Sequence, residues 1–155
     1  MKKKYIYGIL TTFWICIIFS FSLQPADQSQ QLSDGVGMLI LKYILSELLE
    51  MSNSWSEMEW SIFSTVIRKY AHFTEYFVLG VLMILTVKHT KLPRKHVIGF
   101  VLCVLVASAD ETIQLFVPGR AGMITDVMLD SIGSLTGLLS CISIFKVMQK
   151  RKKNI

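Results

Sequence analysis

Four apolar segments set the main constraint on how this chain can fold. Each is close to the roughly 20 residues that a helix needs to cross about 30 Å of hydrocarbon. Hydrophobic residues make up 52% of the 155-residue chain, which is more than a typical soluble domain carries. The segments lie at residues 5–21, 70–87, 97–117 and 127–148. In the last of them, Gly133 and Gly137 have the small-x-x-x-small spacing that permits close contact between membrane helices. The sequence therefore predicts an all-α integral membrane bundle of four transmembrane helices, folded as a single domain over residues 1–155.

Basic residues gather at alternate ends of the predicted spans. They cluster in residues 2–4, 88–96 and 146–153, whereas residues 22–67 hold six carboxylates and only Lys42. By the positive-inside rule, both termini and the loop between the second and third spans lie in the cytoplasm, and residues 22–69 lie outside. A cleaved signal peptide is an alternative interpretation of the first segment, because three lysines precede an apolar stretch and small residues. The charge pattern is compatible with both topologies.

The segment between the first two spans has a helical pattern of its own. Apolar residues recur through 38–49 while Lys42 and Glu47 fall on another face, which is typical of an amphipathic helix lying on the bilayer or against the bundle. Ser54 and Glu57 have capping-box spacing and predict the start of a second helix that runs to just before the second span. Two roles remain open for this outer segment, a shield over the bundle or a functional lid.

Charged and polar side chains interrupt the predicted spans at one end. An ionised side chain buried in hydrocarbon costs roughly 2.5–3.5 kcal/mol on insertion scales, so such residues need partners or a function. In the predicted topology they all reach the outer leaflet, where the second span enters, the third leaves and the fourth begins. The candidate ligand-binding residues are Arg68, Lys69, His72, Glu75, Tyr76, Asp110, Glu111, Gln114, Arg120 and Asp126, and Asp130 follows one turn later. Two interpretations remain, a charge-paired plug that locks the helices together or a functional pocket open to the outer leaflet.

Four members of this set are candidates for acid–base catalysis. They are His72, Glu75, Asp110 and Glu111, because paired acids beside a histidine in a low-dielectric setting have shifted pKa values that catalysis uses. We expect no metal and no cofactor, since no second histidine lies on the outer side and a transition-metal site would have to be carboxylate-rich. The sequence also lacks a Ser-His-Asp elbow, a phosphate-binding glycine loop and an HExxH pattern.

Several short motifs follow one another along the chain in a fixed order. They are Phe21-Ser22-Leu23-Gln24-Pro25, Arg68-Lys69 with His72, Glu75-Tyr76 and Leu79-Gly80, then Asp110-Glu111 with Gln114, Pro118-Gly119-Arg120, and Asp126 with Gly133. Together they resemble the VanZ-like family of small bacterial membrane proteins. The family's named member is associated with low-level resistance to teicoplanin, a lipoglycopeptide that acts at the outer surface. The resemblance therefore implies a multi-span protein of a bacterial cell membrane and an envelope context, without implying a reaction. It also favours retention of the first span, because the first motif directly follows it.

Two classes of function fit these residues. The first is a non-catalytic binder whose outer pocket engages membrane lipids, a lipid-linked cell-wall precursor or a lipoglycopeptide, with arginines recognising phosphate or carboxylate through their planar fork. The second is an integral membrane enzyme that modifies a lipid or wall precursor with the His/Asp/Glu cluster. Ion transport is disfavoured because the inner halves of the spans are apolar. Nucleic acid is not an expected partner, since the basic clusters flank spans and are explained by topology and anionic lipid.

Overall fold

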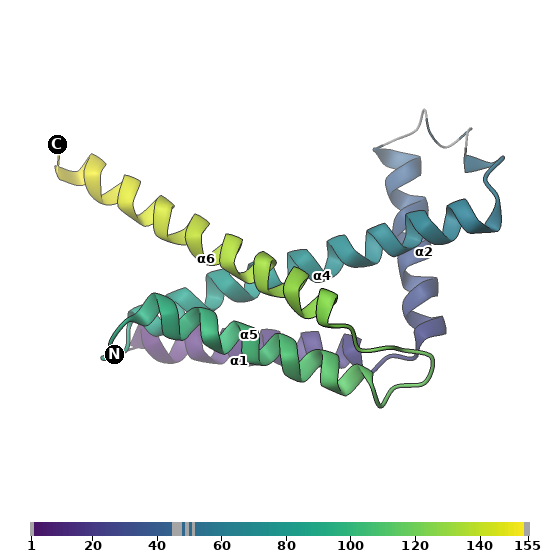
Figure 1. Ribbon diagram of the computed structural model, residues 1–155. Coiled ribbons are helices and arrows are strands. Elements are labelled where there is room, and N and C mark those ends of the chain that lie inside the picture. The colour runs from purple at the N-terminus through teal and green to yellow at the C-terminus, as the bar shows by residue number, and fades with distance from the viewer. Residues whose placement is uncertain (1, 45–47, 49, 51, 154–155) are drawn as a thin grey trace.

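The computed structural model describes residues 2–44, 48, 50 and 52–153, and within these residues the protein is all-helical, with five helices and no strand (Figure 1). The helices are α1 (Lys2–Ser22), α2 (Ala26–Tyr43), α4 (Glu57–Lys88), α5 (Lys95–Gln114) and α6 (Ile124–Lys153). Part of the predicted amphipathic helix, at positions 45–47 and 49, lies outside the described residues. The all-α fold predicted from the sequence is confirmed.

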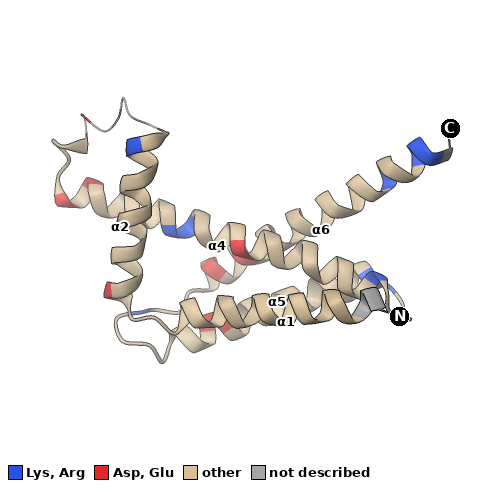
Figure 2. Cartoon of the chain, turned by 180° about the vertical axis from the view of Figure 1, so that it is seen from behind, with Lys and Arg blue, Asp and Glu red and all other residues tan. Residues whose placement is uncertain are grey.

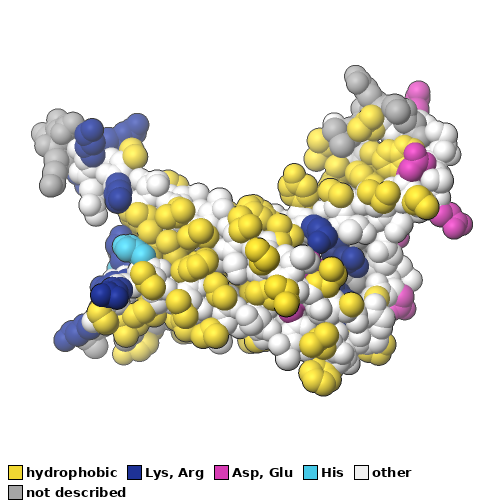
Figure 3. Space-filling view, viewed as in Figure 1, with side chains coloured by type: hydrophobic (Ala, Val, Ile, Leu, Met, Phe, Trp, Pro, Cys, Tyr) yellow, Lys and Arg dark blue, Asp and Glu magenta, His cyan; other side chains and the backbone are white. Residues whose placement is uncertain are grey.

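Four of the helices are long and apolar enough to cross a membrane. These are α1, α4, α5 and α6, so the predicted number of spans is confirmed. Large apolar side chains remain exposed on their outward faces, and Phe13, Leu105 and Leu139 are each more than half exposed. Figure 3 shows such side chains spread over the middle of the molecule. Exposed apolar side chains in this number suit hydrocarbon rather than water, which supports a multi-pass membrane protein.

The second span is longer than predicted. α4 runs unbroken from Glu57 to Lys88, so the predicted outer helix and the second span form one helix about 48 Å long. Neither glycine nor proline occurs in its first 23 residues, and nothing there ends the helix. Its N-cap is Ser56, whose hydroxyl accepts from the Glu59 backbone N–H at 3.3 Å while the Glu59 carboxylate accepts from the Ser56 N–H at 2.8 Å. The capping box predicted at Ser54 was therefore wrong by two residues.

The helix between the first two spans is present, but it begins earlier than predicted. α2 starts at Ala26 directly after Pro25 and lies across the first half of α4 (Figure 1). Its buried residues are Ser29, Ser33, Gly37 and Leu41. A Cβ atom built on Gly37 would lie 2.9 Å from the Phe63 ring, so this small face packs against α4. Leu39, on another side, is exposed. The predicted amphipathic segment lying on the bilayer is thus not shown as a separate element.

α6 crosses α4 at very close range (Figure 1). A Cβ atom built on Gly137 would lie 2.0 Å from the carbonyl oxygen of Phe77, and one built on Gly80 would lie 2.0 Å from the carbonyl oxygen of Ser134. Only glycine allows the two backbones to approach this closely. The contact predicted from the small-residue spacing in α6 is therefore confirmed, and it brings the first turns of α6 against the middle of α4.

Buried apolar side chains from all four membrane-crossing helices form the core. Ile18, Leu79, Cys103 and Leu138 are among them, each no more than 2% exposed. Toward the end that holds the termini, a 2.8 Å hydrogen bond between the hydroxyls of Thr11 and Thr86 joins α1 and α4. The larger set of polar residues lies beyond this core, at the opposite end of the bundle.

Charge is separated between the two ends of the molecule. Both termini and the connection between α4 and α5 lie at one end, where lysine and arginine gather (Figures 2 and 3). Acidic residues lie at the other end, on α2 and at the start of α4 (Figure 2). The fold thus collects the basic clusters at a single end, as the positive-inside rule requires. Which side of the membrane that end faces stays a prediction.

Candidate functional site

Three polar side chains in the last turn of α5 form a connected hydrogen-bond network. The Ser22 hydroxyl, at the end of α1, donates to Asp110. The Gln114 amide donates to Asp110 Oδ2 at 3.5 Å and to Glu111 Oε1 at 3.2 Å. The second Glu111 oxygen accepts from the backbone N–H of Met123 at 2.8 Å. The network therefore joins α1, α5 and the loop that leads into α6, and its three α5 side chains are all buried.

Arg120 ties the same region together from the loop between α5 and α6. The preceding glycine has a φ of 73°, which turns the chain so that the arginine side chain reaches back toward α1. Its guanidinium donates to Gln114 Oε1 and to the carbonyl oxygens of Phe21 and Gln24, each at 3.3 Å. Burial, and then the neighbouring Arg68, lower the pKa of Arg120, although an arginine remains protonated in a protein. None of its three acceptors is a carboxylate, so Arg120 forms no ion pair among the described residues, although the charges of Asp110, Glu111 and Glu75 act on it.

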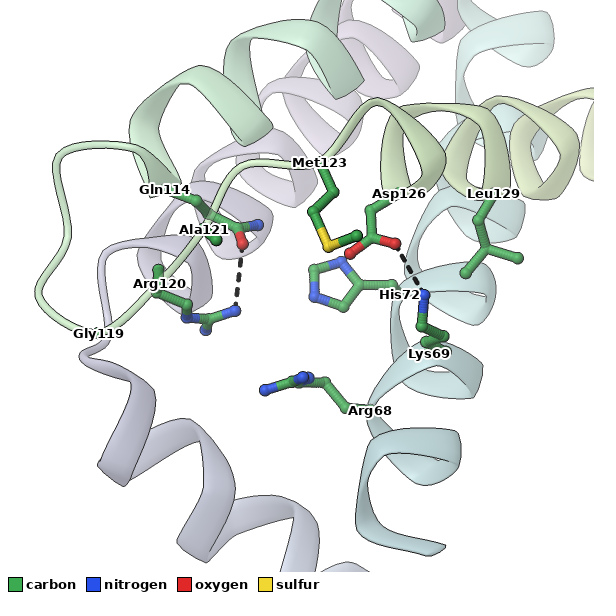
Figure 4. A pocket seen from close by; sticks show the side chains of 10 residues that line it. All are labelled: Arg68, Lys69, His72, Gln114, Gly119, Arg120, Ala121, Met123, Asp126 and Leu129. Atoms are coloured by element: carbon green, nitrogen blue, oxygen red, sulfur yellow. Dashed lines mark hydrogen bonds and ion pairs between the residues drawn. The ribbon is translucent and has the colours of Figure 1, made fainter. Parts of the chain in front are cut away.

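A pocket of about 200 Å³ opens beside this network (Figure 4). Its lining is Arg68, Lys69, His72, Gln114, Gly119, Arg120, Ala121, Met123, Asp126 and Leu129. The guanidinium groups of Arg68 and Arg120 and the imidazole of His72 converge on one space (Figure 4). Lys69 Nζ lies 2.9 Å from Asp126 Oδ1 and forms an ion pair there. Within the described part of the chain, Arg68 forms no ion pair and no hydrogen bond through its side chain. Two of the three cationic side chains in the pocket are therefore available to an anion.

Two further hollows share lining residues with this pocket. One, of about 90 Å³, reaches toward α2 and includes Glu75, and it shares Arg68, His72 and Arg120 with the pocket. The other is an apolar groove of about 450 Å³ lined by Val66, Lys69, Tyr70, Phe73 and Leu129. Because Lys69 and Leu129 belong to both the groove and the pocket, the polar space is continuous with a surface that carries exposed apolar side chains.

A second group of polar atoms lies where α4 meets α6, and these atoms have no partners. Asp130 is fully buried, and neither of its carboxylate oxygens has a hydrogen-bond partner among the described residues. The same holds for His72 Nδ1 and for the Tyr76 hydroxyl, and His72 Nδ1 lies 3.9 Å from Asp130 Oδ1. One ligand atom from each of His72, Asp110 and Asp130 lies within 4.8 Å of the other two. Buried polar atoms normally find a partner, so four unpartnered atoms in one place are unusual.

The structure gathers the candidate residues at one end of the bundle, but in different surroundings. Those that line the pocket are Arg68, Lys69, His72, Gln114, Arg120 and Asp126. Glu75 lines the smaller hollow, while Tyr76, Asp110 and Glu111 are buried beneath. The candidate set omitted Asp130, although it stands four residues after Asp126 on one helix. That spacing was the available signal, and only the α4–α6 packing shows that Asp130 faces His72 rather than the pocket rim.

Comparison with known proteins identifies the family. No curated protein and no solved structure matches the chain significantly. The family model described as VanZ/LLP1 matches residues 7–146, which includes α4 and α5, most of α1 and α6, and every residue of the site. The chain therefore belongs to the VanZ/LLP1 family.

Proposed function

We propose that this protein is a multi-pass membrane protein whose polar pocket binds the anionic head group of a lipid or lipid-linked envelope component at the outer leaflet. The observation that carries the proposal is the charge in the pocket. Arg68 and Arg120 face the same space with no carboxylate bonded to either, whereas Lys69 is already paired with Asp126. Guanidinium groups donate paired hydrogen bonds to phosphate and carboxylate, so an anion would satisfy both arginines at once.

The groove beside the pocket favours an amphiphile over a small free anion. It is lined mainly by Val66, Tyr70, Phe73 and Leu129, and Tyr70 is 69% exposed. A head group in the pocket would place an attached hydrocarbon chain along this groove, where apolar contact adds to the charged contact. A pocket for a free ion would gain nothing from such a surface. The combination supports a ligand with an anionic head and an apolar tail.

The orientation and the cellular context are part of the same proposal. The basic clusters lie at the end of the bundle opposite the pocket, and the positive-inside rule puts that end, with both termini, in the cytoplasm. The pocket would then face the outer leaflet of a bacterial cell membrane. The VanZ-like resemblance adds a role in tolerance to lipoglycopeptides such as teicoplanin, with a lipid-linked wall precursor or the antibiotic itself as a possible occupant of the pocket.

A binding experiment tests this proposal directly. The full-length chain in detergent would be titrated with phosphatidylglycerol, with a polyprenyl phosphate, and with phosphatidylcholine of matched acyl chains, and its thermal unfolding would be followed. We expect stabilisation by the anionic lipids. Arg68→Ala should weaken their binding about tenfold or more, because a charged hydrogen bond contributes roughly 1.5–3 kcal/mol.

The matched control is Lys91→Ala, which removes one positive charge from the loop at the far end of the bundle and should bind as the unchanged protein does. Teicoplanin forms a further arm of the titration. Equal stabilisation by phosphatidylcholine, or equal affinity in Arg68→Ala, would refute head-group recognition.

A second candidate function is favoured by the unpartnered cluster at the α4–α6 contact. His72 belongs both to this cluster and to the pocket, so acid–base groups border the proposed ligand site. An integral membrane enzyme that modifies a lipid or wall precursor would use such groups. Mass spectrometry of lipids and precursors, with and without expression of the protein, separates the two functions. An altered profile that His72→Ala abolishes would favour the enzyme, and an unchanged profile would favour binding alone.

A further inference from the structure

Two fully buried carboxylates lie close together at the α4–α6 contact without a cation bonded to either. Asp110 and Asp130 both have no exposed surface. The hydrogen bonds of Asp110 go to neutral groups, the Ser22 hydroxyl and the Gln114 amide, and the charge of Arg120 attracts Asp110 without an ion pair. Asp130 has no hydrogen-bond partner in the described part of the chain. Buried carboxylates need a partner of opposite charge or must give up their own charge. Either a bound cation or protons must therefore neutralise these two carboxylates.

The nearby cationic side chains do not neutralise these two carboxylates. Lys69 forms an ion pair with Asp126, which lies one turn before Asp130 on α6 and is closer to the surface. The hydrogen bonds of Arg120 all go to neutral oxygens in another direction, those of Gln114, Gln24 and Phe21. The cationic side chains of the site thus leave the charge at Asp130 unmatched.

The side chains around this charge are a set that transition metals bind. His72 on α4, Asp110 on α5 and Asp130 on α6 each offer one ligand atom, and these atoms lie within 4.8 Å of one another. Around a four-coordinate zinc ion, ligand atoms at about 2.0–2.1 Å from the metal are roughly 3.3 Å apart. A modest inward movement of three side chains would therefore close the site. An imidazole with two carboxylates suits zinc, manganese or iron(II) better than magnesium or calcium, which prefer oxygen alone.

We propose that His72, Asp110 and Asp130 bind one divalent transition-metal ion where α4, α5 and α6 meet. Its double positive charge would match the two carboxylates and would give partners to the unpaired atoms of Asp130 and His72. The Ser22 hydroxyl, bonded to Asp110, already holds that ligand in place as the outer partners of metal ligands do. From the sequence we expected no metal, because only one histidine lies on this side. The geometry points to the carboxylate-rich arrangement that a single histidine requires.

Metal content tests the proposal without any knowledge of the lipid ligand. The untagged full-length chain would be stripped with EDTA, loaded separately with Zn²⁺, Mn²⁺ and Fe²⁺, desalted and analysed by elemental mass spectrometry. We expect about one ion per chain for at least one metal, and a higher unfolding temperature than in EDTA, because an ion bound only to the folded state stabilises it. Co²⁺ loading should give a visible absorption band from a His/carboxylate site.

Three variants locate the ion. Asp130→Asn and His72→Gln should each retain a tenth of the metal or less, since even outer partners of a ligand change affinity about 10–100-fold. Asp126→Asn, which removes a carboxylate one turn earlier on the same helix, should retain the full amount. If Asp130→Asn does not fold, two measurements still test the proposal. They are the rise in unfolding temperature of the unchanged protein with metal and the metal content of His72→Gln.

Two results would overturn the proposal. One is an unchanged protein that binds none of the three metals, so that the buried carboxylates are neutralised by protons. The other is full metal retention in both Asp130→Asn and His72→Gln. Head-group binding through Arg68 is measured separately, so the failure of either proposal leaves the other standing.

Discussion

The polar end of the bundle contains two regions built in opposite ways. The anchored region comprises Ser22, Asp110, Glu111, Gln114 and Arg120, and its polar groups bond to one another, to carbonyl oxygens or to the Met123 N–H. The open region comprises Arg68, His72, Tyr76 and Asp130, which lack such bonds among the described residues. Asp110 adjoins His72 and Asp130 of the open region, and Gln114 and Arg120 line the same pocket as Arg68 and His72. Hydrogen bonds hold the anchored region, whereas helix packing holds the open one.

This difference bears on whether the charged residues are a plug or a pocket. Side chains that are fully bonded within the protein have spent their hydrogen-bonding capacity on the fold, as a structural plug would. Unpartnered buried groups persist only where the surrounding structure forces them, and such positions cluster at functional sites. We infer that the plug describes the bonded side chains at the end of α5, and that ligand binding should be sought in the open region and at Arg120, which also lines the pocket.

The largest expected loss of stability comes from disturbing the helix packing that holds the open region. In Gly137→Ala the added methyl group would lie 2.0 Å from the Phe77 carbonyl oxygen, so α4 and α6 must move apart. Overpacking of this kind costs about 1–3 kcal/mol, and contact with a backbone atom places this variant at the upper end. Unfolding in detergent with a denaturant titration measures the change in free energy.

Gly8→Ala is the matched control, because no atom lies within 4 Å of the position its methyl group would take. It should leave stability almost unchanged. If Gly137→Ala were as stable as Gly8→Ala, the α4–α6 contact would not be what positions His72 beside Asp130, and the contrast between the two regions would fail.

Replacing the two arginines should reduce stability by different amounts, both smaller than the loss in Gly137→Ala. Arg120→Ala removes three hydrogen bonds that join the loop, α5 and the end of α1, and at an average of about 0.6 kcal/mol for bonds in membrane proteins this costs roughly 2 kcal/mol. Arg68→Ala removes no hydrogen bond or ion pair with the described residues. Its unfolding free energy should therefore lie within about 0.5 kcal/mol of that of the unchanged protein. Both unfolding curves are measured without added lipid. Equal losses in the two variants would show that Arg68 is structural as well.

Much of this arrangement follows from the sequence, and what does not follow depends on helix packing. Apolar length predicts the four spans, and spacing along α5 predicts that Asp110 and Gln114 share a face. The same spacing places Asp126 and Asp130 together on α6, yet one pairs with Lys69 at the pocket and the other is buried against His72. That distinction depends on how α6 crosses α4. Likewise, no sequence pattern predicts that Arg120 bonds to the carbonyl groups of Phe21 and Gln24, since every residue carries a backbone carbonyl.

The smallest expected effect is a difference in unfolding free energy between variants of two carboxylates, one from each region. It is measured after metal has been removed with EDTA. Both Glu111 oxygens accept hydrogen bonds, from Gln114 and from the Met123 N–H. Glu111→Gln turns one acceptor into a donor that faces another donor, which should cost about 1 kcal/mol. Asp130→Asn removes no hydrogen bond present among the described residues and relieves a buried charge. Its unfolding free energy should fall by less than about 0.5 kcal/mol, or rise.

A loss in metal-free Asp130→Asn as large as that in Glu111→Gln would mean that Asp130 is bonded after all and belongs to the anchored region. The expected result instead makes Asp130 a residue whose removal leaves the metal-free fold intact. Such a side chain is expensive to bury and contributes nothing to stability by itself, so its place in the protein would rest on what it binds.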